Sequence, residues 1–106
     1  MRTEILDLPD LRKGDLALTP SHFKAQWSGQ SVPLDPAGYI VVAAMAQCPG
    51  RVFSRYDLLD VIGDEGERDE RAMDSRMKRV RRAFRSVDPN FDHIETVYSL
   101  GYRWKD

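Results

Sequence analysis

The fold of this chain depends most on residues 70–87, which read ERAMDSRMKRVRRAFRSV. Apolar residues recur in this stretch at intervals of four and three positions: Met73, Met77, Val80, Phe84 and Val87. At about 100° per residue, these positions form one narrow stripe along a helix. The pattern predicts a helix over Glu70–Val87 whose apolar stripe anchors it to a core.

The opposite side of this predicted helix is strongly basic. Between Arg71 and Arg85 there are seven basic residues and one acid, Asp74, whereas the preceding segment Asp57–Glu70 has seven acids and one base. The blocks cancel, so the net charge of −1 and the pI of about 6.1 hide a local concentration of positive charge. Such a helix suits the phosphates and major groove of duplex DNA, although basic runs are often only solvated surface.

The segment before residue 35 predicts a small antiparallel sheet. Apolar and polar residues alternate around Leu16–Leu18 and over Phe23–Trp27, as expected for half-buried strands. Ser28 and Gly29 offer a turn into a further short strand at Ser31–Leu34.

Two shorter helices are predicted next. Asp35 followed by Pro36 is a helix start, and the apolar run that follows stops at Pro49. A second helix is expected to begin after Ser54, a good N-cap, and to end near Gly63. At the end of the chain, two strand-like segments around Ser99-Leu100-Gly101 indicate a terminal hairpin.

The sequence offers no candidate cluster for catalysis and predicts neither a cofactor nor a metal site. His22 and His93 are far apart, and Cys48 has no cysteine or histidine near it in sequence, so no zinc or haem spacing is present. We expect Cys48 to pack as a small hydrophobic residue. With no membrane-length apolar run and no secretory signal, the expected location is cytoplasmic.

Several segments, taken in order, resemble the winged-helix effector domains of OmpR/PhoB-type two-component response regulators. Residues 49–59, PGRVFSRYDLL, are similar to the family's PGRVxSRxxLL, and residues 71–84 to its recognition-helix pattern RTVDxHIxRLRxKL. Residues 94–104, IETVYSLGYRW, resemble its wing pattern IxTVRGxGYRF. Each match alone is weak, but all of them in order are highly specific.

The resemblance implies an α+β fold: a winged helix-turn-helix with an N-terminal antiparallel sheet, three helices and a C-terminal β-hairpin wing. It covers about Gly14–Trp104, so we assign 14–106 to the winged-helix DNA-binding domain and 1–13 to a linker or N-terminal extension. The wing departs from the family pattern in two places. Tyr98 occupies the usual arginine position, and Ser99 replaces a glycine, which is strained if that position needs a positive φ.

The function that the resemblance implies is sequence-specific binding of double-stranded promoter DNA and transcription regulation, as the output domain of a two-component response regulator. Family members bind DNA as homodimers on direct repeats and can contact RNA polymerase through the loop that corresponds to Gly63–Asp69. They usually carry an upstream receiver domain, which nothing in Met1–Leu11 resembles. We therefore expect this chain to be an excised effector domain, with a standalone regulator as the alternative. The alternative is a winged-helix protein-interaction module whose basic face binds an acidic protein without specific DNA binding.

Candidate contacts follow from the helical geometry and from the family motifs. Ser75 and Arg79 are predicted to read base edges. Six residues are predicted to contact phosphates, some of them also bases: Arg55, Arg71, Arg76, Lys78, Arg81 and Arg82. The wing candidates are Thr96, Tyr98 and Tyr102.

Other prominent residues are expected to have structural roles. Asp74 lies four positions before Lys78 and seven before Arg81 on the same predicted helix, and we expect it to pair with one of them. Trp27, Phe84 and Trp104 are expected to belong to the core rather than to the binding surface.

Overall fold

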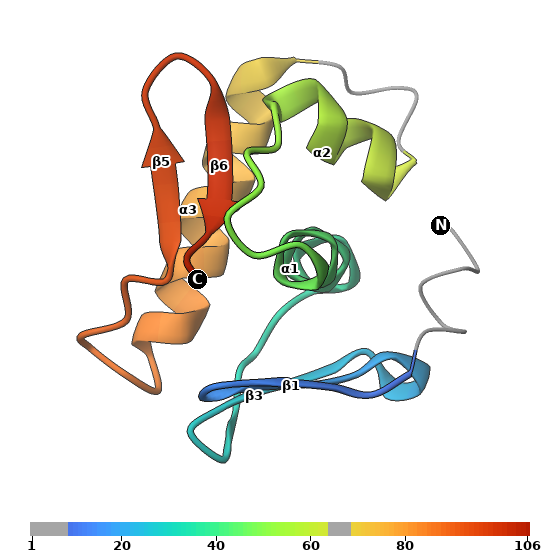
Figure 1. The fold of residues 1–106 in the computed structure, drawn as a ribbon, viewed down its shortest axis with the longest axis vertical. Coiled ribbons are helices and arrows are strands. Elements are labelled where there is room, and N and C mark those ends of the chain that lie inside the picture. The colour runs from blue at the N-terminus through green and yellow to red at the C-terminus, as the bar shows by residue number, and fades with distance from the viewer. Residues whose placement is uncertain (1–8, 64–68) are drawn as a thin grey trace.

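The computed structural model describes residues 9–63 and 69–106, and no helix in that part of the chain is long and apolar enough to cross a membrane. Helix α1 lies between the N-terminal sheet and helix α2, and the C-terminal hairpin lies alongside helix α3 (Figure 1). The elements in chain order are β1 (Leu11–Lys13), β2 (Leu16–Thr19), the 3-10 turn η2 (Pro20–His22), β3 (Lys24–Trp27), β4 (Gln30–Ser31), α1 (Pro36–Gln47), α2 (Arg55–Ile62), α3 (Glu70–Arg85), β5 (Ile94–Val97) and β6 (Gly101–Trp104). The α+β winged-helix prediction is confirmed.

The N-terminal sheet is antiparallel throughout, with the strand order β1-β2-β3-β4. Leu16 pairs with Trp27, and the alternate residues of β2 and β3 are buried against α1, as their period of two predicted. The sheet also contains Leu11–Lys13, which the sequence pattern assigned to the extension 1–13. Leu11 pairs with Leu18 and packs partly buried against the core. The last strand is Gln30–Ser31 rather than the predicted Ser31–Leu34.

Helices α1 and α2 begin where their capping residues predict. The Asp35 carboxylate accepts a hydrogen bond from the amide of Gly38 at 2.7 Å, and Pro36 occupies the first turn. Ser54 and Asp57 form a reciprocal capping box at the start of α2, and Gly63 ends that helix with a φ of 78°. The burial predicted for Cys48 is wrong, because the thiol lies exposed at the end of α1.

Helix α3 ends at Arg85, two positions before the predicted end. Its N-cap is Asp69, whose carboxylate accepts from the amide of Arg71 at 2.9 Å. Four residues of the predicted stripe are buried against the core: Met73, Met77, Val80 and Phe84. The fifth, Val87, lies beyond the helix and is partly buried. The apolar stripe therefore fixes which side of α3 faces outward.

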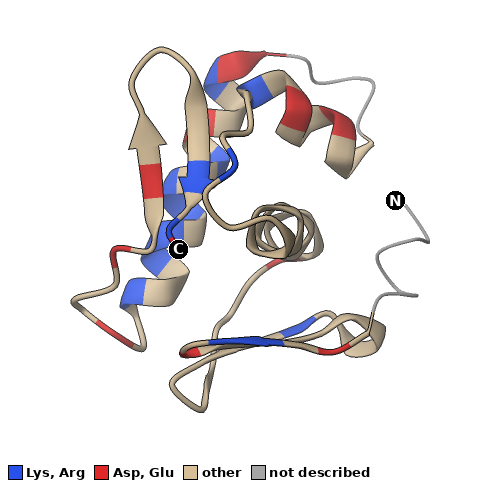
Figure 2. Ribbon diagram, in the orientation of Figure 1, with Lys and Arg blue, Asp and Glu red and all other residues tan. Residues whose placement is uncertain are grey.

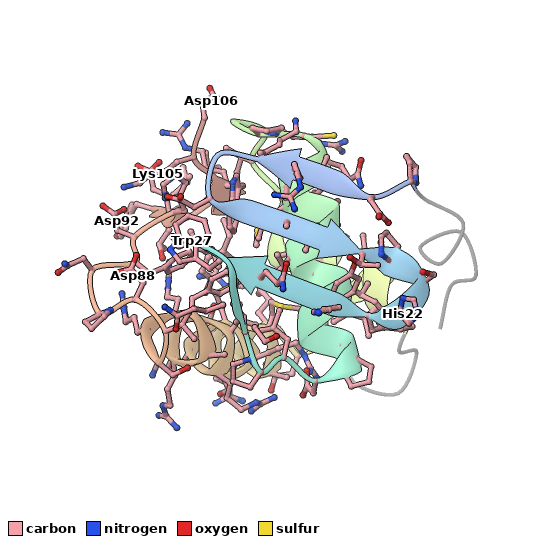
Figure 3. All side chains as sticks on the ribbon, turned by 90° about the horizontal axis from the view of Figure 1, so that it is seen from below. His22, Trp27, Asp88, Asp92, Lys105 and Asp106 are labelled. Carbon is pink, nitrogen blue, oxygen red and sulfur yellow. The ribbon has the colours of Figure 1, made fainter. Side chains whose placement is uncertain are left out.

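Trp27 joins the sheet to the C-terminal part of the domain. Its indole ring makes edge contacts with Phe84, Phe91 and Trp104, with ring centroids 5.0–6.1 Å apart. The indole nitrogen donates a hydrogen bond to the carboxylate of Asp88 at 2.8 Å, and the two side chains lie together in Figure 3. The prediction that Trp27, Phe84 and Trp104 belong to the core is confirmed.

The hairpin is held to the rest of the domain through backbone atoms. Strand β6 pairs with β5 on one side, while on its other side Tyr102 exchanges two backbone hydrogen bonds with Phe53, at 2.8 and 2.9 Å. Gly101 makes this approach possible, since its φ is 146° and a Cβ there would lie 2.0 Å from the carbonyl oxygen of Phe53. The loop before α2 therefore sets the position of the wing.

We expect Gly101→Ala to lower the free energy of unfolding by roughly 2–5 kcal/mol, because the new methyl group both clashes with Phe53 and stands at a φ that L residues avoid. Urea unfolding measures this loss. Gly14→Ala is the matched control: Gly14 has a φ of 57° but nothing within 4 Å of a Cβ, so only the left-handed strain of about 1 kcal/mol remains. Equal losses in the two variants would contradict the role given to the Phe53 contact.

Candidate nucleic-acid interface

The outer face of α3 carries a row of basic side chains with open access to solvent. Lys78, Arg79, Arg82 and Arg85 are exposed, and within the described residues none of them has an ion-pair partner. Ser75 is exposed on the same helix. Figure 2 shows the positive charge gathered along α3, while α2 carries acidic residues. The structure thus leaves one helix face cationic and unoccupied by the protein's own acids.

A polar groove lies between this helix and the base of the wing. It is lined by Lys78, Arg81, Arg82, Arg85, Asp92, Ile94, Glu95, Thr96 and Lys105. Lys105 is paired with Asp92 at 3.3 Å, so the free cations of the groove come from α3. The cations from α3 make the groove better suited to phosphates than to an apolar ligand.

Asp74 is the only acidic residue in α3 beyond its first turn, and it forms a connection inside the protein. Its Oδ1 atom accepts hydrogen bonds from the Nε of Arg55, at 2.7 Å, and from the Tyr102 hydroxyl. The expected pairing with Lys78 or Arg81 is therefore wrong. The carboxylate faces the start of α2 and strand β6. Arg55 and Tyr102, which are distant in sequence, therefore bind it in place of the neighbouring residues of its own helix.

The charge states of this connection are mutually stabilising. Burial opposes ionisation of Asp74, but the hydrogen bonds from Tyr102 and Arg55 outweigh it and lower the pKa of the carboxyl below its usual range. The Asp74 hydrogen bond raises the pKa of Arg55. Burial and the same carboxylate raise the pKa of Tyr102 to about 12. Tyr102 is consequently a protonated donor at neutral pH.

Arg81 is turned toward the wing and not toward solvent. Its Nη2 donates to the carbonyl oxygen of Ile94 at 2.9 Å and to the hydroxyl oxygen of Thr96 at 2.8 Å. Its guanidinium also lies 5.5 Å from the ring centroid of Tyr102, the same distance as that of Arg55. Burial lowers the pKa of Arg81, although an arginine stays charged. Three predicted contacts, Arg81, Tyr102 and Thr96, are thus joined to one another.

The remaining predicted contacts on α3 differ in how free they are. Arg71 is 91% exposed at the start of the helix, and only a 3.4 Å contact holds it to Asp69. Arg76 is 23% exposed and lies 3.7 Å from the carboxylate of Asp35. Arg71 can therefore follow a ligand, while Arg76 is drawn toward the start of α1.

The tip of the wing is apolar and carries no cation. Tyr98 is 91% exposed and Leu100 is 60% exposed, and no basic residue occurs between Ile94 and Gly101. The wing's own arginine, Arg103, is paired with Glu95 at 2.7 Å. Sequence reasoning passed over Leu100, although its position in a predicted turn between two strands signals exposure. Ser99 has a φ of 64°, so the strain expected at that position is present.

Comparison with known proteins places this arrangement in a family. Residues 29–104 match the family described as "Transcriptional regulatory protein, C terminal". The chain belongs to this family. This membership confirms the resemblance to OmpR/PhoB-type effector domains and the expected class of function, a DNA-binding output domain for transcription regulation.

Individual relatives agree with this assignment. The chain is similar to the transcriptional regulatory protein BaeR of Escherichia coli O6:H1, with 35% identity over 91 residues that cover 85% of this chain and 38% of BaeR. Among solved structures, the DNA-binding domain of CpxR from E. coli has a TM-score of 0.77 and 25% identity, covering 93% of this chain and 98% of that domain. The DNA-binding domain of the response regulator AdeR, solved in complex with an intercistronic region, has a TM-score of 0.79 and 21% identity. The match covers 91% of this chain and 98% of the AdeR domain, and it supports the fold.

The Asp74 connection predicts how this transcriptional-regulator domain responds to acid. Because the folded-state pKa of Asp74 is lowered, its stabilisation is complete above about pH 3.8 and is lost as the pH falls below that value. We expect Asp74→Asn to lower the free energy of unfolding by roughly 1–2 kcal/mol at pH 7, and the gap to close at lower pH. Urea unfolding between pH 2 and 7 measures it. Asp92→Asn, an exposed control, is expected to follow the parent; a gap independent of pH for Asp74→Asn contradicts the assignment.

Proposed function

We propose that this domain reads duplex DNA with the outer face of α3 and regulates transcription as the output domain of a two-component response regulator. The observation that carries the proposal is the row of unpaired cations opposite the buried stripe of the same helix. Burial of the stripe holds the helix in one rotation, so the exposed side chains all project into the space that a major groove would occupy.

Ser75 and Arg79 are proposed as the base-reading residues. They lie one turn apart on the exposed face of α3, and neither is held by a neighbouring side chain within the described residues. An arginine can donate two hydrogen bonds to a guanine edge, and a serine hydroxyl can donate to or accept from any base. Specificity in this proposal rests on few side chains.

The other cations are proposed to hold phosphates. Lys78 and Arg82 border the groove beside the wing, and Arg71 stands at the start of α3. Arg76 would have to leave Asp35 to take part. Arg55 uses its Nε for Asp74, which leaves its terminal guanidinium nitrogens for the DNA backbone. At the wing tip, Tyr98 is proposed to make an aromatic contact in place of a charged one.

The partners of the whole protein are part of the same proposal. The chain spans 38% of the length of BaeR. An upstream receiver domain in the full protein is proposed from the resemblance to response regulators. Two domains are proposed to bind direct repeats as a homodimer. RNA polymerase is proposed to meet the loop Gly63–Asp69, whose residues 64–68 lie outside the described part of the chain; its acidic sequence is unsuited to phosphate and favours a protein partner.

Selection of bound sequences from a random DNA pool tests this function. We expect Arg79→Ala to lose preference at one or two base positions, at a cost of roughly 1–3 kcal/mol there, because a base-edge contact disappears. Arg55→Ala should weaken all sequences alike and reduce the slope of log K against log salt by about one. Arg12→Ala on β1, an exposed arginine outside α3 and the wing, serves as the control.

The outcome also separates the two classes of function. Binding of random polyanions without any preferred sequence, unchanged by Arg79→Ala, contradicts the proposal and favours a module that binds an acidic protein.

A further inference from the structure

Arg81 differs from the outward-pointing basic residues of α3 in where its charge is placed. Lys78, Arg79 and Arg82 point outward without ion-pair partners among the described residues, whereas the guanidinium of Arg81 is partly buried against the wing. Both of its acceptors, the Ile94 carbonyl oxygen and the Thr96 hydroxyl oxygen, belong to strand β5. The helix that is to read DNA is therefore bonded directly to the outer strand of the hairpin.

We propose that Arg81 is a positioning residue that fixes the wing against α3 and does not itself bind a phosphate. The inference rests on the proposed DNA binding and assigns one of its residues a different role. Sequence position alone makes Arg81 one more cation of the recognition helix. Its contacts make it the brace between the two parts of the DNA-binding surface.

The hairpin needs such a brace on the β5 side. A two-stranded hairpin is at best marginally stable on its own, and here β6 is secured by the backbone bridge to Phe53. Strand β5 pairs only with β6 within the described residues, and Arg81 reaches it from α3. Loss of Arg81 leaves the Ile94 carbonyl without this donor and releases the outer edge of the wing.

The brace belongs to a larger network around one ring. The guanidinium groups of Arg55 and Arg81 each lie 5.5 Å from the centroid of the Tyr102 ring, whose hydroxyl donates to Asp74. These contacts connect α2, α3, β5 and β6. A wing held in this way is ordered before DNA arrives, so binding does not have to supply that ordering.

A positioning role and a phosphate contact predict different salt dependences. A side chain that neutralises a phosphate releases counterions, so its removal lowers the slope of log K against log salt by about 0.9. A side chain that only orders the wing multiplies the binding constant by the same factor at every salt concentration, so its removal leaves the slope unchanged. The slope of log K against log salt thus distinguishes the two roles of an arginine even where the loss of affinity is equal.

The experiment compares Arg81→Gln with its neighbour Arg82→Gln on the selected DNA site between about 50 and 400 mM salt. For Arg82→Gln we expect the slope to fall by about 0.9. For Arg81→Gln we expect affinity to fall by roughly three- to ten-fold at every salt concentration, with the parent slope. A lowered slope for Arg81→Gln, or an unchanged affinity, overturns the proposal.

Two further variants keep the test decisive if Arg81→Gln folds poorly. Arg81→Lys keeps the charge but has a shorter side chain and lacks the planar guanidinium that lies over the Tyr102 ring, so it should lose affinity as the glutamine variant does. Recovery of parental binding overturns the proposal. Thr96→Val removes one acceptor from the wing side. Combined with Arg81→Gln, it should add no further loss, because both variants break the same contact. Additive losses count against the brace.

Hydroxyl-radical footprints give an independent measurement. We expect Arg81→Gln to lose protection under the wing and to retain it under α3. Failure of the proposed function has a different signature, in which Arg82→Gln also changes nothing and the parent domain prefers no sequence. A normal Arg82→Gln effect with a phosphate-like slope for Arg81→Gln removes the positioning role alone.

Discussion

The arrangement of the binding surface depends on one carboxylate inside a basic helix. Asp74 accepts hydrogen bonds from the start of α2 and from the second strand of the wing, so a single side chain relates three elements. Its negative charge compensates the guanidinium of Arg55, whose Nε lies 2.7 Å away. Without it, the Arg55 side chain, which is 21% exposed, would lose its acidic partner. The acid that weakens the electrostatic attraction for DNA is the one that organises the surface.

Charge and burial are divided within α3 in a way that serves both folding and recognition. The narrow apolar stripe takes all of the packing, so the cations on the other faces need no role in stability. Their mutual repulsion is tolerated because water screens it on the exposed side. Arg76 and Arg81 are exceptions: Arg76 lies near the carboxylate of Asp35, and Arg81 joins the helix to the wing. The adjacent arginines Arg81 and Arg82 therefore differ: Arg81 contacts the wing, and Arg82 is exposed to solvent.

Features decided by local chemistry were predicted from the sequence. The caps Asp35 and Ser54, the stripe of α3 and the alternation of β2 and β3 each follow from residues a few positions apart. The errors concern contacts that only the folded chain creates. The partners of Asp74 lie 19 and 28 positions away, and Arg81 reaches residues of β5 13 and 15 positions away. Leu11 enters the sheet because Leu18 is opposite it, and Cys48 is exposed because α1 ends there. The pairing of Leu11 is not visible in the local sequence, whereas Pro49 already marked the end of the helix beside Cys48.

The bridge between Phe53 and Tyr102 has a consequence for how such a domain can diversify. Because the hairpin is held by main-chain atoms and by side chains near its base, the three residues of its tip contribute little to holding it. Tyr98 and Leu100 are thus open to replacement over evolutionary time without moving the scaffold. An arginine at the tip in the family pattern and a tyrosine here stand on the same hairpin scaffold. Replacing the tip residue therefore changes the chemistry of the contact but not the position from which it is made.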